Sequence, residues 1–434
     1  MVRLIFGDLL ANARVWLGTL LIAAATAAVG SVVAGDIATA LEVGGDNALA
    51  LYGISGVITA FTLVTALIVV GSVAGLTVTL QQREYALWQL VGLRPALVRT
   101  VVTCQLLVVA LLGAVLGGLA AAPVLGPLFR YAFAGSPSLA SLEPRFGVGI
   151  ALPVVLFVVV VLTIGGSRSA GRAARTPPIR SLRETEPPDR RMTPARWIGG
   201  LATAGIIVAV LASLPGTGRD TLAVPLMLIA PLVAGVLAAF GPLFLARLVR
   251  AWTSLLPFEG PWYLARNSTA FNVGRSTATI SPLTVAIALA GGLYSANGTA
   301  GDGDSGLSTG SVVLLLGGPL LLAVLGAVAT VFMSSRRRER EFALIVAAGG
   351  TPGTVLTAAA WEAVIYVGTA LLLGGASVLA TALAGAWAAG VFPSFGVLPA
   401  LTVALGSLVL VLAATVLPTA VALRHEVPSV LAPE

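Results

Sequence analysis

The stretch REYALWQLVGLRP at residues 83–95 recurs as REFALIVAAGGTP at residues 340–352. The two copies lie 257 residues apart and align without a gap. A match of this length in one register predicts that the chain holds two similar structural units. The register also continues into the next segment, where the aligned pairs are Gly117 with Gly374, Gly118 with Gly375, and Gln105 with Glu362.

Each copy predicts a short helix, a tight turn and a long apolar helix. The first copy places Leu87, Leu90 and Val91 on one helical face. Gly92 and Gly349 suit a left-handed helix stop, and the proline that ends each copy suits the first turn of the next helix. Since a span-length apolar run precedes each copy, we predict an elbow between two membrane spans. An ordinary hairpin between spans would also carry arginine and a turn, but the repeat favours a shared docking role.

The composition is that of a polytopic membrane protein in a lipid bilayer. The chain is 57% apolar and only 10% charged, whereas soluble domains are about a quarter charged. All 25 cationic residues are arginine, so the lysine that a phosphate-binding P-loop needs is absent. We therefore expect no ATPase site in this chain and no enzymatic activity of its own.

The remaining reactive residues exclude several other classes of site. Cys104 and His425 are each the only residue of their type, so we expect no internal disulfide, no metal site and no serine–histidine catalytic arrangement. The net charge of +7 does not indicate nucleic-acid binding, because the arginines lie mostly in short loops between apolar runs.

Ten apolar runs are long enough, or nearly so, to cross a bilayer, which takes roughly 20 residues. We predict an all-α protein with both termini in the cytoplasm, because that orientation puts 22 arginines on the cytoplasmic side and three outside. The predicted spans are about residues 16–33, 54–80, 97–125, 146–166, 197–214, 222–246, 280–294, 311–333, 355–387 and 398–423.

The spans divide as four, two and four. We predict a four-span unit with a cytoplasmic tail at 1–184, a basic linker with two linking spans at 185–258, and a second four-span unit at 259–434. The two units have the same orientation, because six spans separate equivalent points, so the internal repeat is parallel. The charge bias of cytoplasmic loops explains the arginine-rich linker better than a dedicated anion site does.

Short amphipathic segments precede the first span of each unit, at 1–14 and 262–275. Few charges lie inside the predicted spans. Arg99 can extend to the cytoplasmic face. Glu362 is deeper and is a possible intramembrane functional residue: it either faces water at the interface or binds an arginine between helices.

The elbows resemble those of the FtsX-like permeases, the membrane subunits of MacB-type ABC transporters. The shared motif is an Arg-Glu start, a helix, a glycine turn and a long span with paired glycines. A Pro-x-x-x-Leu tail after a unit is similar at Pro178–Leu182, and the Pro428–Leu431 stretch is one residue shorter. An acidic residue early in the third span of a unit is matched by Glu362 but not by Gln105.

This resemblance implies a permease that works with a separate ABC ATPase, two copies per chain, in a bacterial plasma membrane. ATP and Mg²⁺ would bind to the ATPase, so this chain would need no cofactor. The elbows would dock the ATPase, with Gly92 and Gly349 at their turns. Polar contacts would come from Arg83, Glu84, Arg340 and Glu341, while Tyr85, Leu87, Leu90, Phe342 and Leu344 would fill its groove or pack on the neighbouring span.

The predicted extracytoplasmic loops, 34–52 and 295–310, are too short to bury a core, unlike the larger domains usual in the family. We therefore expect the cargo to be a hydrophobic or amphiphilic molecule such as a peptide, lipid or antibiotic, exported or extracted within the bilayer. One alternative is an ATPase-linked regulator or sensor without transport. The other is an ATP-independent carrier, against which the parallel repeat and the lack of midplane charges argue.

Overall fold

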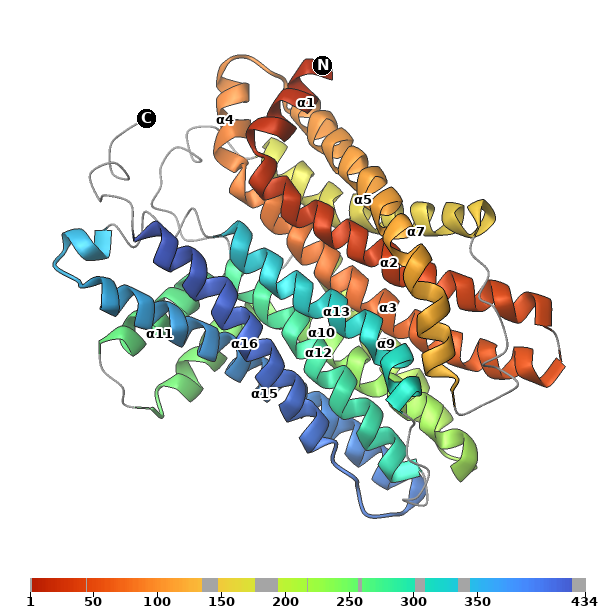
Figure 1. The fold of residues 1–434 in the computed structure, drawn as a ribbon. Helices are drawn as coiled ribbons and strands as arrows, with labels where there is room; N and C mark the ends of the chain where they lie inside the picture. The colour runs from red at the N-terminus through yellow and green to blue at the C-terminus, as the bar shows by residue number, and fades with distance from the viewer. Residues whose placement is uncertain are drawn as a thin grey trace.

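The computed structural model describes residues 2–43, 45–134, 147–175, 194–216, 218–256, 260–300, 309–334 and 344–423. Within these ranges the chain is a bundle of long helices with short connections, and no strand occurs (Figure 1). In chain order the helices are α1 (Val2–Ala11), α2 (Ala13–Val43), α3 (Gly45–Leu80), α4 (Gln82–Leu90), α5 (Pro95–Ala132), α7 (Val148–Arg175), α9 (Pro194–Ser213), α10 (Arg219–Thr253), α11 (Pro261–Phe271), α12 (Val273–Ala300), α13 (Thr309–Met333), α15 (Pro352–Ala389) and α16 (Val397–Ala422).

The long helices have the length and apolarity of membrane spans. In the described ranges, nine helices are long and apolar enough to cross a bilayer, and α7 carries a shorter apolar segment, Ala151–Gly166. Helices suit this setting because each satisfies its backbone hydrogen bonds internally, where no water is available. The prediction of an all-α, multi-pass membrane protein is therefore confirmed.

The same packing scheme occurs twice. In the first half α2, α3, α5 and α7 pack together, and in the second half α12, α13, α15 and α16 do so. Each helix pair that is in contact in one group has its counterpart in contact in the other. The two groups meet through α3 and α13, with α2 against α13 and α12 against α3. This reciprocal arrangement is what a pseudo-two-fold relation between the two groups produces.

A glycine in each unit lets two helices approach closely. A Cβ atom on Gly117 of α5 would lie 2.1 Å from the carbonyl oxygen of Ala24 and 2.7 Å from the Cβ of Ala27. A Cβ on Gly374 of α15 would meet the carbonyl oxygen of Thr284 at 3.2 Å and the Cβ of Ile287 at 2.9 Å. The contacted positions correspond at a spacing of 260 residues, so the same crossing is built in both units.

A pair of threonines joins the first two long helices of each unit. The hydroxyls of Thr19 and Thr77 lie 2.7 Å apart between α2 and α3. Those of Thr279 and Thr330 lie 3.1 Å apart between α12 and α13. Hydrogen bonds of this kind hold helices together in a membrane, where apolar surfaces alone have no preference for one another over lipid.

We expect Gly117→Ala to destabilise the protein by about 1–3 kcal/mol, because the added methyl group overlaps the α2 backbone and forces α2 and α5 apart. Gly118→Ala is the matched control, since nothing lies within 4 Å of a Cβ at that position. Thermal unfolding of the two purified variants measures the difference. Equal midpoints for the two would show that the close crossing carries no stability.

The linking helix α10 makes the two units unequal. It packs along α12 and α15, where Ala230 fits against Gly292 and Leu226 lies near Gly385. An apolar 18-residue stretch of α12 is consequently buried completely, whereas only 56% of the corresponding stretch of α2 is buried. The second unit is thus enclosed on a face that the first leaves open to the surroundings.

The prediction of a loop at 34–52 is wrong. Helix α2 continues to Val43 and α3 already begins at Gly45, so the two helices form a hairpin. Asp36, which falls within that predicted loop, is instead fully buried in α2 and is hydrogen-bonded to Ser55 of α3. The second loop, predicted at 295–310, is also shorter than expected, because α12 extends to Ala300 and α13 begins at Thr309.

Candidate functional site

Both elbows end their short helix in the same way. In the first, Leu93 N donates to Trp88 O at 3.0 Å and Gly92 N donates to Gln89 O at 3.0 Å. This pair of bonds defines a Schellman motif, which needs a left-handed residue at its turn. Gly92 supplies it with φ +100°. The predicted stop of the first elbow is therefore confirmed.

The second elbow repeats this geometry at the aligned positions. Gly350 N donates to Ile345 O at 2.9 Å, Gly349 N donates to Val346 O at 3.0 Å, and Gly349 has φ +95°. The long helices α5 and α15 then begin at Pro95 and Pro352, as predicted. Two identical turns therefore lead directly into the two longest helices of the described chain.

The elbows present leucines to the outside. Leu87 is 45% exposed and Leu90 is 53% exposed on α4, and Leu344, which aligns with Leu87, is 61% exposed. The side chain of Arg83 and residues Arg340, Glu341 and Phe342 lie outside what the structure describes, as do the two proline-containing tails. The described part of each elbow thus exposes leucine, next to Arg94 in the first turn and Thr351 in the second.

The Tyr85 side chain lies in the interior of the first unit and not on the surface of the elbow. Its side chain is fully buried in the core of the first unit, where its hydroxyl donates to Gln81 Oε1 and its ring packs 5.3 Å from that of Trp88. Burial raises the pKa of the Tyr85 phenol well above 10.0, and the carboxylates of Asp8 and Glu84 act in the same direction. Of the two roles left open for Tyr85, packing on the neighbouring helices is the one the structure supports.

Glu84 anchors the first elbow to the amino-terminal helix. Asn12 Nδ2 donates to Glu84 Oε2 at 2.7 Å and to Asp8 Oδ1 at 3.1 Å. Gln105 Nε2 of α5 donates to the other Asp8 oxygen at 2.7 Å. The network joins α1, the elbow helix α4 and the long helix α5, so a displacement of the elbow acts on all three.

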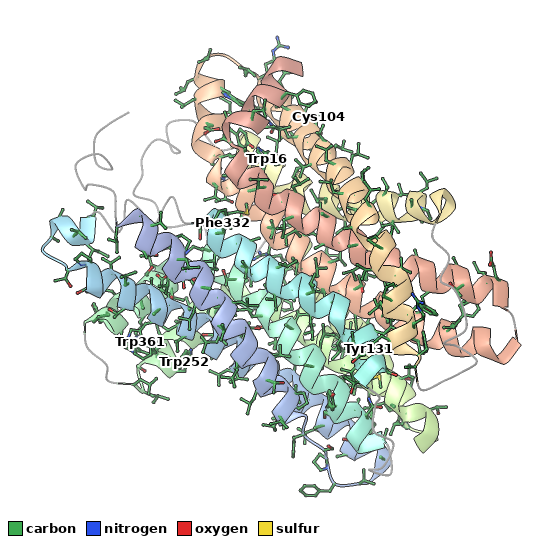
Figure 2. All side chains as sticks on the ribbon, in the orientation of Figure 1. Trp16, Cys104, Tyr131, Trp252, Phe332 and Trp361 are labelled. Carbon is green, nitrogen blue, oxygen red and sulfur yellow. The ribbon has the colours of Figure 1, made fainter. Side chains whose placement is uncertain are left out.

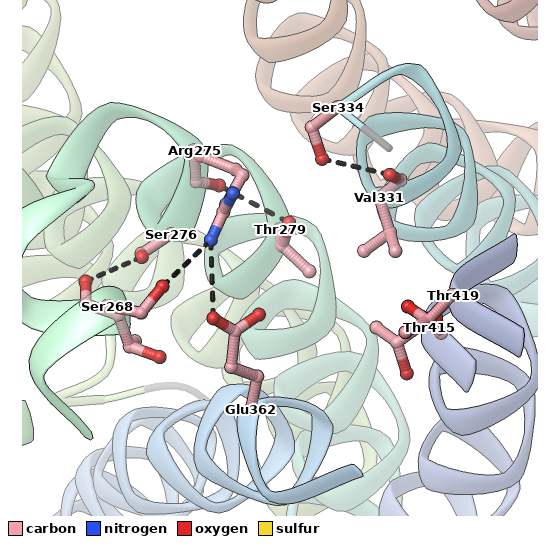
Figure 3. Close-up of polar contacts among 10 residues, drawn as sticks. Ser268, Arg275, Ser276, Thr279, Val331, Ser334, Glu362, Thr415 and Thr419 are labelled. Carbon is pink, nitrogen blue, oxygen red and sulfur yellow. Dashed lines mark hydrogen bonds and ion pairs between the residues drawn. The ribbon is translucent and has the colours of Figure 1, made fainter. Parts of the chain in front are cut away.

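The second unit has a polar cluster at the equivalent place (Figure 3). Arg275 of α12 lies 3.4 Å from Glu362 Oε1 of α15, and the same Arg275 nitrogen donates to Ser268 Oγ of α11 at 3.3 Å. The side chains of Arg275 and Glu362 are only 9% and 8% exposed. Of the two alternatives for Glu362, binding an arginine between helices is confirmed and a water-facing position is wrong.

The two clusters use aligned positions with different chemistry. Gln105 and Glu362 occupy the same place on the long helix, and Asp8 and Ser268 occupy the same place on the short one. In the first unit the acid is on the short helix and the long helix donates, whereas in the second the acid is on the long helix. Each arrangement provides a donor for the carboxylate, which is partly buried at Asp8 and buried at Glu362.

A tryptophan cluster lies beside Glu362. Trp262 of α11 packs between Trp252 and Trp361, with ring centroids 6.1 Å and 5.1 Å away. Its indole nitrogen donates to Thr253 O at 3.3 Å, and that of Trp252 donates to Thr369 Oγ1 of α15 at 3.0 Å. Figure 2 shows Trp252 and Trp361 side by side at this end of the bundle. The cluster therefore ties α10 and α11 to the start of α15.

Sequence reasoning missed the partners in these clusters. Asp8, Asn12 and Arg275 lie in the two segments, 1–14 and 262–275, that were predicted only to be amphipathic. The available signal was the alignment of the two short helices, which end at Ala11 and Phe271 and are each followed by an asparagine. Comparison of the chain with protein-family models, with curated proteins and with solved structures finds no match.

Proposed function

We propose that this chain is the permease subunit of an ABC transporter, similar to the FtsX-like permeases. The proposal includes ten spans arranged as four, two and four, with both termini and both elbows in the cytoplasm of a bacterial cell. The single observation that carries it is the pair of matching elbows. Each has a Schellman turn, an exposed leucine and direct continuity into a 38-residue helix.

In this proposal a separate ATPase docks on each elbow, two copies per chain. The exposed Leu87, Leu90 and Leu344 fill grooves on the ATPase, and closure of the ATPases on ATP pushes the elbows. A 38-residue helix is about 57 Å long at 1.5 Å per residue, which is more than the thickness of a bilayer. Displacement at the elbow therefore reaches the opposite end of α5 and α15.

The proposed cargo is a hydrophobic or amphiphilic molecule, exported or extracted from the bilayer. The hairpin of α2 and α3 leaves no room for a folded domain at its tip, because only one residue separates the two helices. The surfaces of the described bundle are rich in exposed leucine and valine, which suit contact with lipid and with cargo of lipid-like chemistry.

The decisive experiment is purification of the tagged chain from its native membranes, with mass spectrometry of co-purifying proteins and an assay of vanadate-sensitive ATP hydrolysis. We expect a P-loop ATPase in fixed proportion with the wild type. We expect Leu87→Glu combined with Leu344→Glu to lose most of it, because each glutamate places a charge in the apolar contact.

Leu255→Glu is the matched control, since Leu255 is 80% exposed, follows the end of α10 and is outside both elbow motifs. It should keep the ATPase. Retention of the ATPase by the double elbow variant would contradict docking at the elbows. A chain that purifies alone from membranes where it is abundant would contradict the transporter itself.

A further inference from the structure

Asp36 is a buried carboxyl group that the proposed transport cycle does not use. It lies on α2 near the hairpin tip, at the end of the bundle away from the elbows, and is fully buried. One carboxyl oxygen, Oδ2, is hydrogen-bonded to Ser55 Oγ of α3. The other, Oδ1, has no hydrogen-bond partner among the described residues.

The contacts of Ser55 indicate where the protons lie. Its hydroxyl oxygen is also 2.7 Å from the carbonyl oxygen of Leu51, one turn earlier on α3. A serine hydroxyl has a single hydrogen to donate, and a backbone carbonyl can only accept. When that hydrogen is directed to Leu51, the bond between Ser55 and Asp36 needs a hydrogen from Asp36. A neutral carboxylic acid satisfies both contacts and an ionised carboxylate does not.

No described cation offsets a charge on Asp36. On the helices packed against α2, Arg130 is exposed at the end of α5, α13 carries no charged residue, and the α7 arginines lie in its last turns at the elbow end. Glu42 of α2 is exposed near the tip, and the side chain of Asp46 on α3 is not described. An isolated carboxylate in such surroundings is strongly disfavoured, whereas Glu362 has Arg275 beside it.

We infer that Asp36 and Ser55 form a proton-binding site inside the bundle. In this site Asp36 is a neutral carboxylic acid that keeps its proton and donates a hydrogen bond to Ser55 Oγ. The site keeps this proton because burial without a described cation beside it disfavours the ionised form of Asp36. This site is independent of ATPase docking.

Infrared spectroscopy of the purified full-length chain tests the inference, because a carboxylic acid and a carboxylate absorb in separate regions. At neutral pH we expect the difference between wild type and Asp36→Asn to show loss of one carboxylic-acid carbonyl band, which shifts in heavy water. Glu362→Gln is the matched control and should show loss of carboxylate bands only. Loss of carboxylate bands in the Asp36→Asn difference would overturn the inference.

Thermal unfolding supplies a second reading. Asp36→Asn should unfold near the wild-type temperature, because its neutral amide still donates to Ser55. Asp36→Ala should unfold at a lower temperature, since it leaves the Ser55 hydroxyl without that donor. A large drop for Asp36→Asn, matching that of Asp36→Ala, would indicate that the site needs a negative charge and would also overturn the inference.

Discussion

Replacing Arg275 with methionine is expected to lower the free energy of unfolding by about 3–5 kcal/mol, because it leaves the Glu362 carboxylate buried without its cation. The two side chains are 3.4 Å apart and almost completely enclosed by α11, α12 and α15. Glu362→Met should lower the free energy of unfolding by a similar amount, because it leaves the Arg275 guanidinium group buried without its carboxylate. Unfolding titrations in detergent micelles measure both.

The double variant Arg275→Met with Glu362→Met tests whether the two side chains stabilise the protein through their contact with each other. Well-packed apolar residues often replace a buried ion pair with little loss, so we expect the double variant to be more stable than either single one. Arg250→Met is the matched control, since it removes an exposed arginine at the same end of the bundle. A double variant whose loss equals the sum of the single losses would show that the two residues do not interact.

Trp262→Ala is expected to destabilise the protein by about 3–5 kcal/mol, the range typical of a buried tryptophan. Trp262 is 2% exposed, and its removal breaks ring contacts with Trp252 and Trp361 and a hydrogen bond to Thr253. The helices α10 and α11 would then be less firmly attached to α15. Thermal unfolding followed by tryptophan fluorescence measures the loss.

Two further variants show which part of Trp262 matters. Trp262→Phe keeps an aromatic ring and loses the hydrogen bond, so we expect a loss of about 1 kcal/mol from that bond plus a smaller packing term. Trp197→Ala is the control, because Trp197 of α9 is 45% exposed and its ring lies 5.3 Å from that of Phe240. If Trp262→Ala were as mild as Trp197→Ala, the cluster would not hold these helices together.

The elbows could be predicted from local sequence because their geometry depends on local chemistry. A glycine adopts positive φ at little steric cost, and a proline suits the first turn of a helix. Gly92 and Gly349 have positive φ, and Pro95 and Pro352 begin the long helices. The repeat also aligns Gly117 with Gly374, but nothing local distinguishes these two glycines, which lie at close crossings, from Gly118 and Gly375, which face open space.

The hairpin of α2 and α3 was predicted wrongly, because residues 34–52 were taken as a loop between two spans. Residues 36–43 contain no proline or glycine, and the turn signal in this region is Gly44-Gly45. Asp36 remains in the helix since Ser55 on the neighbouring helix provides a hydrogen-bonding partner. Ser55 lies 19 residues away in the sequence, and no local pattern indicates that it would contact Asp36.

Apolar run length and glycine–proline punctuation were enough to predict helices, membrane spans and two similar elbows, because each depends on residues close together in the chain. The partners of the buried polar groups depend on how distant helices pack. Glu362 meets an arginine 87 residues earlier, and Tyr85 points into the core while Leu87 points out. Only the packing of the helices brings these buried polar groups to their partners. Each group requires such a partner because it is buried.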